Sequence, residues 1–556
     1  MSPQAKSRVN PQANPYCEHR PIWALLAGAL AAGLCLSLSL PPWGLWILAF
    51  PGAALLWWLL EQSTPKRRLL AGGIAGIGMF GPGLWWSLSF NTYGGIALIL
   101  LESLFIGIAC LAVPSRSGRL VALPGAMLLA EALRSTWPFG GLPMGGIALG
   151  QASGPLAGTA RIGGPLLLVG LVWLGGAGIA SLLLSIVRPS FCSPCSSTKV
   201  AIAAGVALAT VLVFAVVASE APDGGPAIRT EQVAAVQGGG VRGLNYSQVV
   251  PQIVLFAQFA ATSSGLVDAP SQPRSILVLW PEDVVAVDGL LADSPDQEQL
   301  SNLAGQLNAT LVVGVTETVS QTAFRNEMIA IAPDGQIVSH YEKVHRVPFG
   351  EYIPYRSFFE HFANLSGVPL DAVPGTRDGV LKTPVGDLGT MISYEVFYAN
   401  RGRIPTRNGA QLLLVPTNTS SYSTGQVPAQ EIASSRLQAI AEGRDLVQAA
   451  PTGYSAIINN RGRLETRSSL GRRQVLIEYV ALRNGSTIYE RLGDTPWLLL
   501  AALALAAGWV LALVDRKRSG DSQMPAGGRR LGDSGIPVGG NGLSHLNHAD
   551  NSPGYS

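Results

Sequence analysis

The sequence predicts a polytopic α-helical membrane protein that carries a water-soluble α/β domain inserted before its last span. Only 13% of the 556 residues are charged and 48% are hydrophobic, whereas soluble domains carry about 25% charged residues. Residues 1–219 hold 12 Lys or Arg and 4 Asp or Glu, while residues 220–556 hold 26 and 31. This uneven charge predicts a membrane half followed by a soluble half. The net charge of +3 gives no reason to expect a nucleic-acid partner.

Eight apolar stretches are long enough to cross a bilayer, because about 20 helical residues span roughly 30 Å of hydrocarbon. Their approximate ranges are 22–41, 43–60, 69–90, 95–113, 120–138, 160–187, 200–219 and 497–514. The first is not a cleaved signal peptide, because further spans follow at once and no small-residue cleavage site closes it. The predicted organisation is a disordered tail at 1–20, seven spans within 21–219, a soluble domain at 220–495, an eighth span at 496–515 and a disordered tail at 516–556.

Basic residues in the short loops orient the spans, because cytoplasmic loops are enriched in Lys and Arg. If the spans alternate in direction, the basic residues that flank them fall on one side of the membrane: Lys6, Arg8, Arg20, Lys66, Arg67, Arg68, Arg116, Arg119, Arg188, Lys199, Arg516, Lys517 and Arg518. We therefore predict that both termini are cytoplasmic and that residues 220–495 are extracytoplasmic.

Glu131 and Arg134 stand inside the fifth predicted span, where charged side chains are costly unless they are paired or functional. A spacing of three places them on one helix face. The sequence leaves two interpretations open, a structural ion pair within the helix bundle or a contact with lipid headgroups.

All five cysteines lie in the membrane half, at positions 17, 35, 110, 192 and 195. The soluble domain therefore has no disulfide, no thiolate metal site and no cysteine nucleophile. Cys192 and Cys195 have the spacing of a redox or zinc half-site, but without partner ligands we interpret them as loop thiols in a reducing compartment.

Short apolar runs alternate with helical patterns in the soluble domain, which is typical of a layered α/β fold. The predicted helices cover about 246–262, 294–308 and 428–446, with Leu437, Ile440 and Ala441 at helical spacing in the last. The predicted strands are Glu231–Val236, Ser275–Trp280, Thr310–Val315, Glu327–Ala332, Gly389–Ser393 and Gln411–Pro416.

Three reactive side chains follow strand-like segments of this domain. Glu282 comes after Trp280 and Pro281, where a raised pKa would suit a general base, although a solvated turn acid fits the pattern too. Lys343 precedes a loop rich in Pro, Gly and aromatic residues, where it could face a developing oxyanion or simply be a surface lysine. Ser393 ends an apolar strand and would by itself be unremarkable. His340 and His345 flank Lys343 without a third ligand, so the sequence predicts no metal site, and we expect no cofactor.

These three elements, in this order, resemble the nitrilase (carbon–nitrogen hydrolase) superfamily, whose fold is an αββα sandwich with a Glu-Lys-Cys triad. The most specific segment is Val347-Pro-Phe-Gly-Glu-Tyr-Ile-Pro354, together with the pairing of Trp280-Pro-Glu282 and Ser393-Tyr394-Glu395. Eight spans with this domain before the last one resemble the apolipoprotein N-acyltransferase family of the bacterial cell membrane. The resemblance covers roughly residues 22–515.

The resemblance implies a catalytic role for several residues. Glu282 would be the general base, Lys343 the oxyanion-stabilising cation and Glu351 an auxiliary acid in the active-site loop. Ser393 occupies the position of the nucleophile, and Tyr394 and Glu395 match the two residues that follow it. The implied reaction moves an acyl chain from a membrane phospholipid, through an acyl-enzyme, to the α-amine of a lipoprotein's N-terminal diacylglyceryl-cysteine.

The sequence departs from that family where the nucleophilic cysteine is replaced by Ser393, and where Thr419-Ser420-Ser421-Tyr422 follows Asn418. A thiol is already a few per cent thiolate at neutral pH, whereas a hydroxyl depends on its base. Three alternatives follow: a slower serine-based acyltransferase, a homologue that has lost catalysis, or a nucleophile that has been exchanged. A non-catalytic homologue would act as a membrane scaffold or as partner of a glycosyltransferase of lipid-linked sugars. Amide hydrolysis, as in soluble nitrilases, would leave the eight spans unexplained.

Overall fold

The computed structural model describes residues 21–115, 117–187, 194–244, 248–268, 276–361 and 364–521, without the side chains of 194–197 and 519–521. Contacts divide the chain into Met1–Ala512 and Leu513–Ser556, and the fold below is that of the first unit. The predicted tails lie outside the described residues, except for 516–521. Several residues used in the predictions lie outside them as well: Lys6, Arg8, Arg20, Arg116, Arg188, Cys17, Cys192 and the side chain of Cys195.

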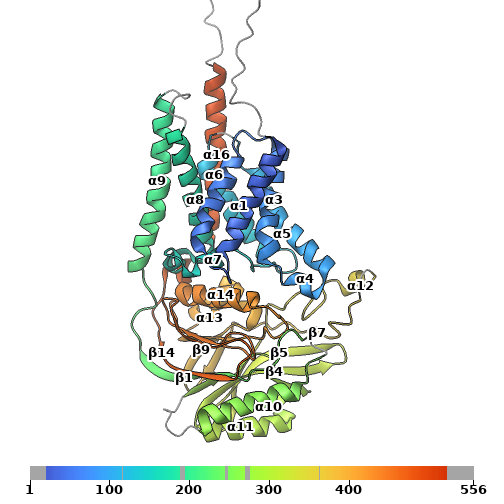
Figure 1. Ribbon diagram of the computed structural model, residues 1–556. Helices are drawn as coiled ribbons and strands as arrows, with labels where there is room; N and C mark the ends of the chain where they lie inside the picture. The colour runs from blue at the N-terminus through green and yellow to red at the C-terminus, as the bar shows by residue number, and fades with distance from the viewer. Residues whose placement is uncertain are drawn as a thin grey trace, which may run out of the picture. The chain divides into compact units, whose positions relative to one another are not determined.

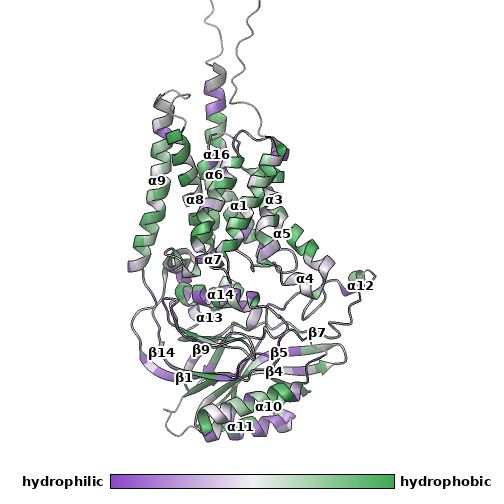
Figure 2. Ribbon diagram, in the orientation of Figure 1, coloured by the Kyte–Doolittle hydropathy of each residue, from purple (hydrophilic) through white to green (hydrophobic). Residues whose placement is uncertain are grey.

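Eight helices match the eight apolar stretches (Figures 1 and 2). They are α1 (Ile22–Ser39), α2 (Ala49–Leu59), α3 (Pro65–Gly83), α5 (Thr92–Ala112), α6 (Arg119–Arg134), α8 (Ala160–Val187), α9 (Pro194–Glu220) and α16 (Thr495–Asp521). Among the described residues, five helical segments are long and apolar enough to cross a membrane, namely α1, α5, α8 with the turn before it, α9 and α16. In α2, α3 and α6 the apolar run is shorter or begins with charged residues.

The predicted spans differ from the helices mainly at their ends. The run at 43–60 becomes a 3-10 turn at Trp46–Leu48 followed by α2. The run at 69–90 starts earlier, because Thr64 caps α3 by accepting from the Arg67 backbone N–H, a favourable arrangement at a helix start. It also ends earlier, since α3 stops at Gly83 and a separate short helix, α4 (Ser87–Phe90), follows.

Small residues let these helices pack closely. A Cβ at Gly33 of α1 would lie 2.0 Å from the Ala75 carbonyl oxygen of α3, and a Cβ at Gly76 would lie 2.5 Å from Ser103 Cα of α5. Only glycine permits such close contact between backbones, as is common in membrane helix bundles.

A buried charge network joins α5 and α6. Arg134 is fully buried and forms 3.0 Å ion pairs with Glu131 and with Glu102 of α5. The predicted pairing of Glu131 with Arg134 is confirmed, and it favours the structural interpretation because Arg134 also donates to the carbonyls of Leu142 and Met144. The network thus fixes the loop that follows α6.

Two sheets form the soluble part. The first has the order β14-β1-β2-β4-β5-β6, with β3 beside β4 and β7 beside β5. Its strands are β1 (Arg229–Gln237), β2 (Leu277–Leu279), β3 (Val285–Asp288), β4 (Thr310–Ser320), β5 (Ala323–Ile331), β6 (Ile337–Glu342), β7 (Asp371–Ala372) and β14 (Gln474–Leu482). The second has the order β13-β12-β11-β10-β9-β8. Its strands are β8 (Val380–Thr383), β9 (Gly386–Thr390), β10 (Leu412–Pro416), β11 (Leu446–Ala449), β12 (Ala456–Ile458) and β13 (Leu464–Arg467).

The two sheets pack face to face between two helical layers, which is the αββα arrangement that the resemblance implies (Figure 1). Leu412 and Leu414 pack with residues such as Val233 and Leu277 between the sheets. The outer face of the first sheet is covered by α10 (Pro251–Thr262) and α11 (Pro295–Leu307), and the second sheet is covered by α13 (Ala399–Arg407) and α14 (Gln426–Glu442). Successive residues of a strand point to opposite faces. Because the central strands are covered by a sheet on one face and by helices on the other, both of their faces are apolar.

The α14 layer also contacts the apolar helices. Gln426 donates to the Pro82 carbonyl (2.6 Å) and Gln430 to the Gly83 carbonyl (2.9 Å) at the end of α3. Gln430 in turn accepts from the Gly145 N–H (3.0 Å). These bonds satisfy backbone groups at the end of α3, so α14 holds the α/β fold against the bundle of apolar helices.

The predicted elements of the soluble domain are largely confirmed. All six predicted strands and three helices are present, with shifted ends. Residues 246, 247 and 275, at the ends of two of the predicted elements, lie outside the described residues. The helix predicted at 428–446 is wrong at its end, because Gly443 adopts a left-handed φ of 63° and stops α14 at Glu442. The strand predicted at 389–393 ends at Thr390, and Ser393 instead begins a 3-10 turn to Phe397.

Candidate active site

Glu282 lies in the tight turn between β2 and β3 and is buried, with 2% of its surface exposed. Its Oε1 accepts hydrogen bonds from Lys343 Nζ (2.7 Å) and Asn326 Nδ2 (2.8 Å). Burial raises the pKa of Glu282, and the neighbouring Lys343 cation opposes that rise. A raised pKa makes this carboxylate a stronger base than one in water, which suits a proton acceptor.

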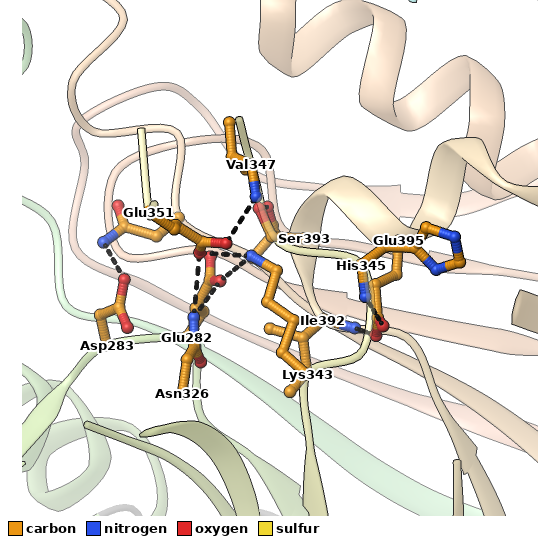
Figure 3. A network of polar contacts seen from close by, with 12 residues as sticks. Glu282, Asp283, Asn326, Lys343, His345, Val347, Glu351, Ile392, Ser393 and Glu395 are labelled. Atoms are coloured by element: carbon orange, nitrogen blue, oxygen red, sulfur yellow. Dashed lines mark hydrogen bonds and ion pairs between the residues drawn. The ribbon is translucent and has the colours of Figure 1, made fainter. Parts of the chain in front are cut away.

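Lys343 directly follows β6, and its ammonium group lies between two carboxylates (Figure 3). Its Nζ forms 2.7 Å ion pairs with both Glu282 and Glu351, and its side chain is 2% exposed. Burial by itself would lower the pKa of Lys343, but the two carboxylates outweigh burial and hold this pKa above its ordinary value. The group is therefore a permanent buried cation.

Glu351 closes the network from the loop after β6. Its Oε1 accepts from Lys343 and from Asn326 Nδ2 (3.2 Å), and its Oε2 accepts from the backbone N–H of Val347 (2.8 Å). Glu351 therefore fixes its own loop against the lysine.

Ser393 sits at the first residue of the 3-10 turn with a φ of 52°, a conformation that few non-glycine residues adopt. Figure 3 shows the side chains of Glu282, Lys343, Glu351 and Ser393 converging; Lys343 and Glu351 come from the segment after β6, and the other two from separate segments. Ser393 is 9% exposed, and its Oγ lies within hydrogen-bond distance, 3.3 Å, of Thr417 Oγ1. Among the described residues it makes no direct hydrogen bond to Glu282 or Lys343.

Glu395 ties the serine turn to the lysine segment. Its carboxylate accepts from the backbone N–H groups of Ile392 (2.9 Å), Val344 (2.9 Å) and His345 (3.0 Å), and from the Tyr341 hydroxyl (2.9 Å). A carboxylate that serves four donors acts as an acceptor only. Glu395 thus positions Ser393 relative to Lys343 without facing the network itself.

Tyr394 ties the same turn to the membrane helices. Its hydroxyl donates to the Gly141 carbonyl (2.8 Å), and the Tyr398 hydroxyl donates to the same oxygen (3.1 Å). Gly141 belongs to the loop after α6 that Arg134 holds. The serine turn is therefore anchored on a loop that a buried ion network fixes.

Sequence reasoning missed four polar residues of this region. Asn326 contacts both carboxylates from the middle of β5, and nothing in its strand pattern marks it. Asp283 directly follows Glu282 in the sequence; burial raises its pKa to about 7, and Thr316 donates to it (2.9 Å). Thr417 and Glu431 lie beyond Ser393. Most residues of α14 are buried, Glu431 among them, but no pattern in the sequence singles it out.

His345 does not face a metal site in the described part of the chain. Its ring stacks on Tyr398, with centroids 4.2 Å apart, and burial lowers its pKa to about 4. No group of three or more His, Cys, Asp or Glu side chains suited to a metal ion occurs among the described residues.

Known proteins match both halves of the chain. The apolipoprotein N-acyltransferase N-terminal domain model matches residues 32–178, and the carbon-nitrogen hydrolase model matches residues 233–486. The apolipoprotein N-acyltransferase of Mycolicibacterium smegmatis is 31% identical over 521 residues, covering 88% of this chain and 85% of that protein. The Pseudomonas putida protein of the same name is 29% identical, covering 88% and 97%.

Solved structures match the soluble half. Saccharomyces cerevisiae Nit3, a member of the nitrilase superfamily, is 18% identical with a TM-score of 0.33, covering 46% of this chain and 91% of that one. A mutant of the amidase from Nesterenkonia sp. AN1 is 18% identical with a TM-score of 0.35, covering 48% and 98%.

Proposed function

This chain belongs to the apolipoprotein N-acyltransferase family, and from this premise we propose that it completes lipoprotein maturation with Ser393 as its nucleophile. Its substrates would be a membrane phospholipid, the acyl donor, and a lipoprotein with an N-terminal diacylglyceryl-cysteine, whose α-amine accepts the chain. The observation that carries the proposal is the buried network of Glu282, Lys343 and Glu351, which converges with Ser393 in a chain aligned over 88% of its length with such enzymes.

In the first half-reaction, Glu282 takes the proton of the Ser393 hydroxyl while Oγ attacks the ester carbonyl of the phospholipid. The carbonyl oxygen becomes an oxyanion, and the buried Lys343 cation stabilises it. The ester C–O bond then breaks, the lysophospholipid oxygen takes the proton back from Glu282, and the acyl chain stays on Ser393 as an ester.

In the second half-reaction, the α-amine of the lipoprotein attacks the acyl-serine carbonyl. Glu282 removes a proton from the amine, Lys343 again stabilises the oxyanion, and the C–O bond to Ser393 breaks. Ser393 recovers its proton from Glu282 and the product is an amide. Glu351 keeps the Lys343 cation in place, and Glu395 and Tyr394 hold the serine turn.

We place the network at the outer surface of the bacterial plasma membrane. Support comes from the eight helices of the fold and from the basic residues of the short loops. Apart from Arg161 at the start of α8, these residues fall on one side if the helices alternate. This arrangement has both termini in the cytoplasm, seven spans within 21–219, an extracytoplasmic domain at 220–495 and an eighth span at 496–515. Two lipid substrates could then reach the site without leaving the bilayer.

The scaffold hypothesis gains no support from the comparisons, because the curated relatives reported above are named for the transferase. A scaffold also has no use for a lysine buried between two carboxylates, since burying charges costs free energy.

Acyl transfer to a lipopeptide amine is the direct test of this function. The full-length protein in phospholipid vesicles, given a synthetic diacylglyceryl-cysteine peptide, should yield the N-acylated peptide. Ser393→Ala should abolish the product because no oxygen remains to form the acyl-enzyme. Mass spectrometry of the peptide measures it, and equal yields from wild type and Ser393→Ala would contradict a role for Ser393.

Ser393→Cys should raise the rate of transfer in the same assay. A thiol has a pKa of about 8.5 against a far less acidic hydroxyl, so it is already partly ionised and depends less on its base. The thioester formed is also more reactive toward an amine than an oxygen ester. A cysteine variant slower than wild type would contradict this expectation and would show that acidity of the nucleophile does not limit the rate.

A further inference from the structure

A second buried carboxylate reaches the Ser393 hydroxyl from the side of α14. Thr417, at the end of β10, lies with its Oγ1 3.3 Å from Ser393 Oγ, and the same Oγ1 is hydrogen-bonded to Glu431 Oε1. Thr417 is fully buried and Glu431 is 1% exposed. Hydrogen bonds thus connect the proposed nucleophile, through Thr417, to a carboxyl group that has no role in the two half-reactions.

The proton of the Thr417 hydroxyl sets the direction of both hydrogen bonds. A threonine hydroxyl has a single proton and two acceptor lone pairs, so Thr417 can donate to Ser393 or to Glu431 but not to both. If Glu431 is protonated, it donates to Thr417, and Thr417 donates to Ser393 Oγ. If Glu431 is ionised, Thr417 must donate to the carboxylate, and Ser393 donates its own proton to Thr417.

We propose that Glu431 is a positioning residue that acts in its protonated form and, through Thr417, leaves the Ser393 proton free for Glu282. This inference rests on the proposed role of Ser393 as nucleophile. In the protonated arrangement, Ser393 Oγ is an acceptor toward Thr417, so its O–H can turn to the base. When Glu431 is ionised, the Ser393 O–H donates to Thr417 instead of to Glu282, so the attack of Ser393 Oγ on the ester is suppressed.

The surroundings of Glu431 favour the protonated form. Its Oε2 is buried and has no hydrogen-bond partner among the described residues, and an uncompensated charge there would be costly. Burial raises the pKa of Glu431 to about 8. The hydrogen bond from Thr417 lowers this pKa and the negative charge of Glu282 raises it. The positive charges of Lys343 and Arg242 lower it. The charged and titratable groups that interact with Glu431 from neighbouring segments are Arg242, Glu282, Lys343 and Tyr422.

The consequence is a specific pH dependence of Ser393 acylation. A carboxyl group with a raised pKa is protonated below that value and ionises above it, so the active direction holds at neutral pH and is lost as pH rises through about 8. The first half-reaction should therefore slow on the alkaline side, although a serine nucleophile with a carboxylate base would otherwise gain from rising pH.

The experiment measures single-turnover acylation of Ser393 by phospholipid between pH 6 and 10, with the full-length protein in vesicles and no amine acceptor. Glu431→Gln keeps an N–H donor toward Thr417 and should retain most of the neutral rate while losing the alkaline decline. Glu431→Leu and Thr417→Val each remove the donor to Ser393 and should slow acylation roughly tenfold, the usual effect of one hydrogen bond. The double variant should lose no more than either single one, because both act through one chain.

Glu442→Gln is the matched control. Glu442 is a fully buried carboxyl on the same helix, but its charged neighbours are Glu490, Arg403, Arg444 and Asp494, so its substitution should leave the pH profile in place. The proposal is overturned if Glu431→Gln keeps the alkaline decline, or if the losses in Glu431→Leu and Thr417→Val add. Absence of any acyl adduct on wild-type Ser393 would instead contradict the proposed function.

Discussion

Replacing Lys343 with methionine is expected to remove acyl transfer almost completely and to destabilise the soluble fold. The cation lies 2.7 Å from both Glu282 and Glu351, so its loss takes away the stabilisation of the oxyanion. Removal of one such donor typically lowers the rate by about 10²- to 10³-fold. It also leaves two carboxylates facing each other in a largely buried site, and breaking a buried ion pair costs about 3–5 kcal/mol.

Lys382→Met is the matched control for this experiment. The Lys382 side chain is 66% exposed and pairs with Asp387 at the surface, where ion pairs contribute at most about 1 kcal/mol. Transfer rate and the midpoint of thermal unfolding should both stay close to wild type. A Lys343→Met protein that transfers acyl chains at the normal rate would show that the lysine is only structural.

Glu282→Gln is the second large effect. Glutamine keeps an oxygen that can accept from Lys343 and Asn326, so the network should still form, but it cannot take the serine proton. Loss of a general base costs about 10²- to 10⁴-fold in rate, and kcat should fall while KM for the lipopeptide stays nearly constant.

The control here is Glu465→Gln, which exchanges a carboxylate on the edge strand β13, bonded to Asn459 at an exposed position. The kinetic constants are measured with the vesicle assay, and folding is checked by the thermal midpoint. A Glu282→Gln enzyme that is folded and retains more than a tenth of the wild-type rate would assign the base to another group.

Much of this architecture could be predicted from the sequence because it depends on local patterns. Runs of apolar residues marked the membrane helices, and apolar runs between helical patterns marked the buried strands β1, β2, β4, β5, β9 and β10. Glu282, Lys343 and Glu351 stand in short segments with distinctive Pro, Gly and aromatic neighbours, and the structure brings all three into one network.

What the sequence did not predict depends on contacts between distant segments. Glu102 is the one charged residue of the apolar helix α5, and only the packing against α6 shows that it completes the Arg134 network. Asn326 follows the ordinary alternation of a strand. The link from Thr417 and Glu431 to Ser393 depends on the packing of β10 against α14, which the sequence does not show. Short strands such as β7, β8 and β13 are not buried on both faces, so they contain few apolar residues and their sequences resemble loops.

Ser393 should carry a fatty acyl group between the two half-reactions, and this intermediate can be detected directly. The full-length protein is incubated with phospholipid vesicles without amine acceptor, digested, and the peptide that carries Ser393 is analysed by mass spectrometry. We expect this peptide to be heavier by one fatty acyl group, which is lost on addition of a diacylglyceryl-cysteine peptide and is absent from Ser393→Ala. A wild-type protein that transfers acyl chains while this peptide remains unmodified throughout would contradict this expectation.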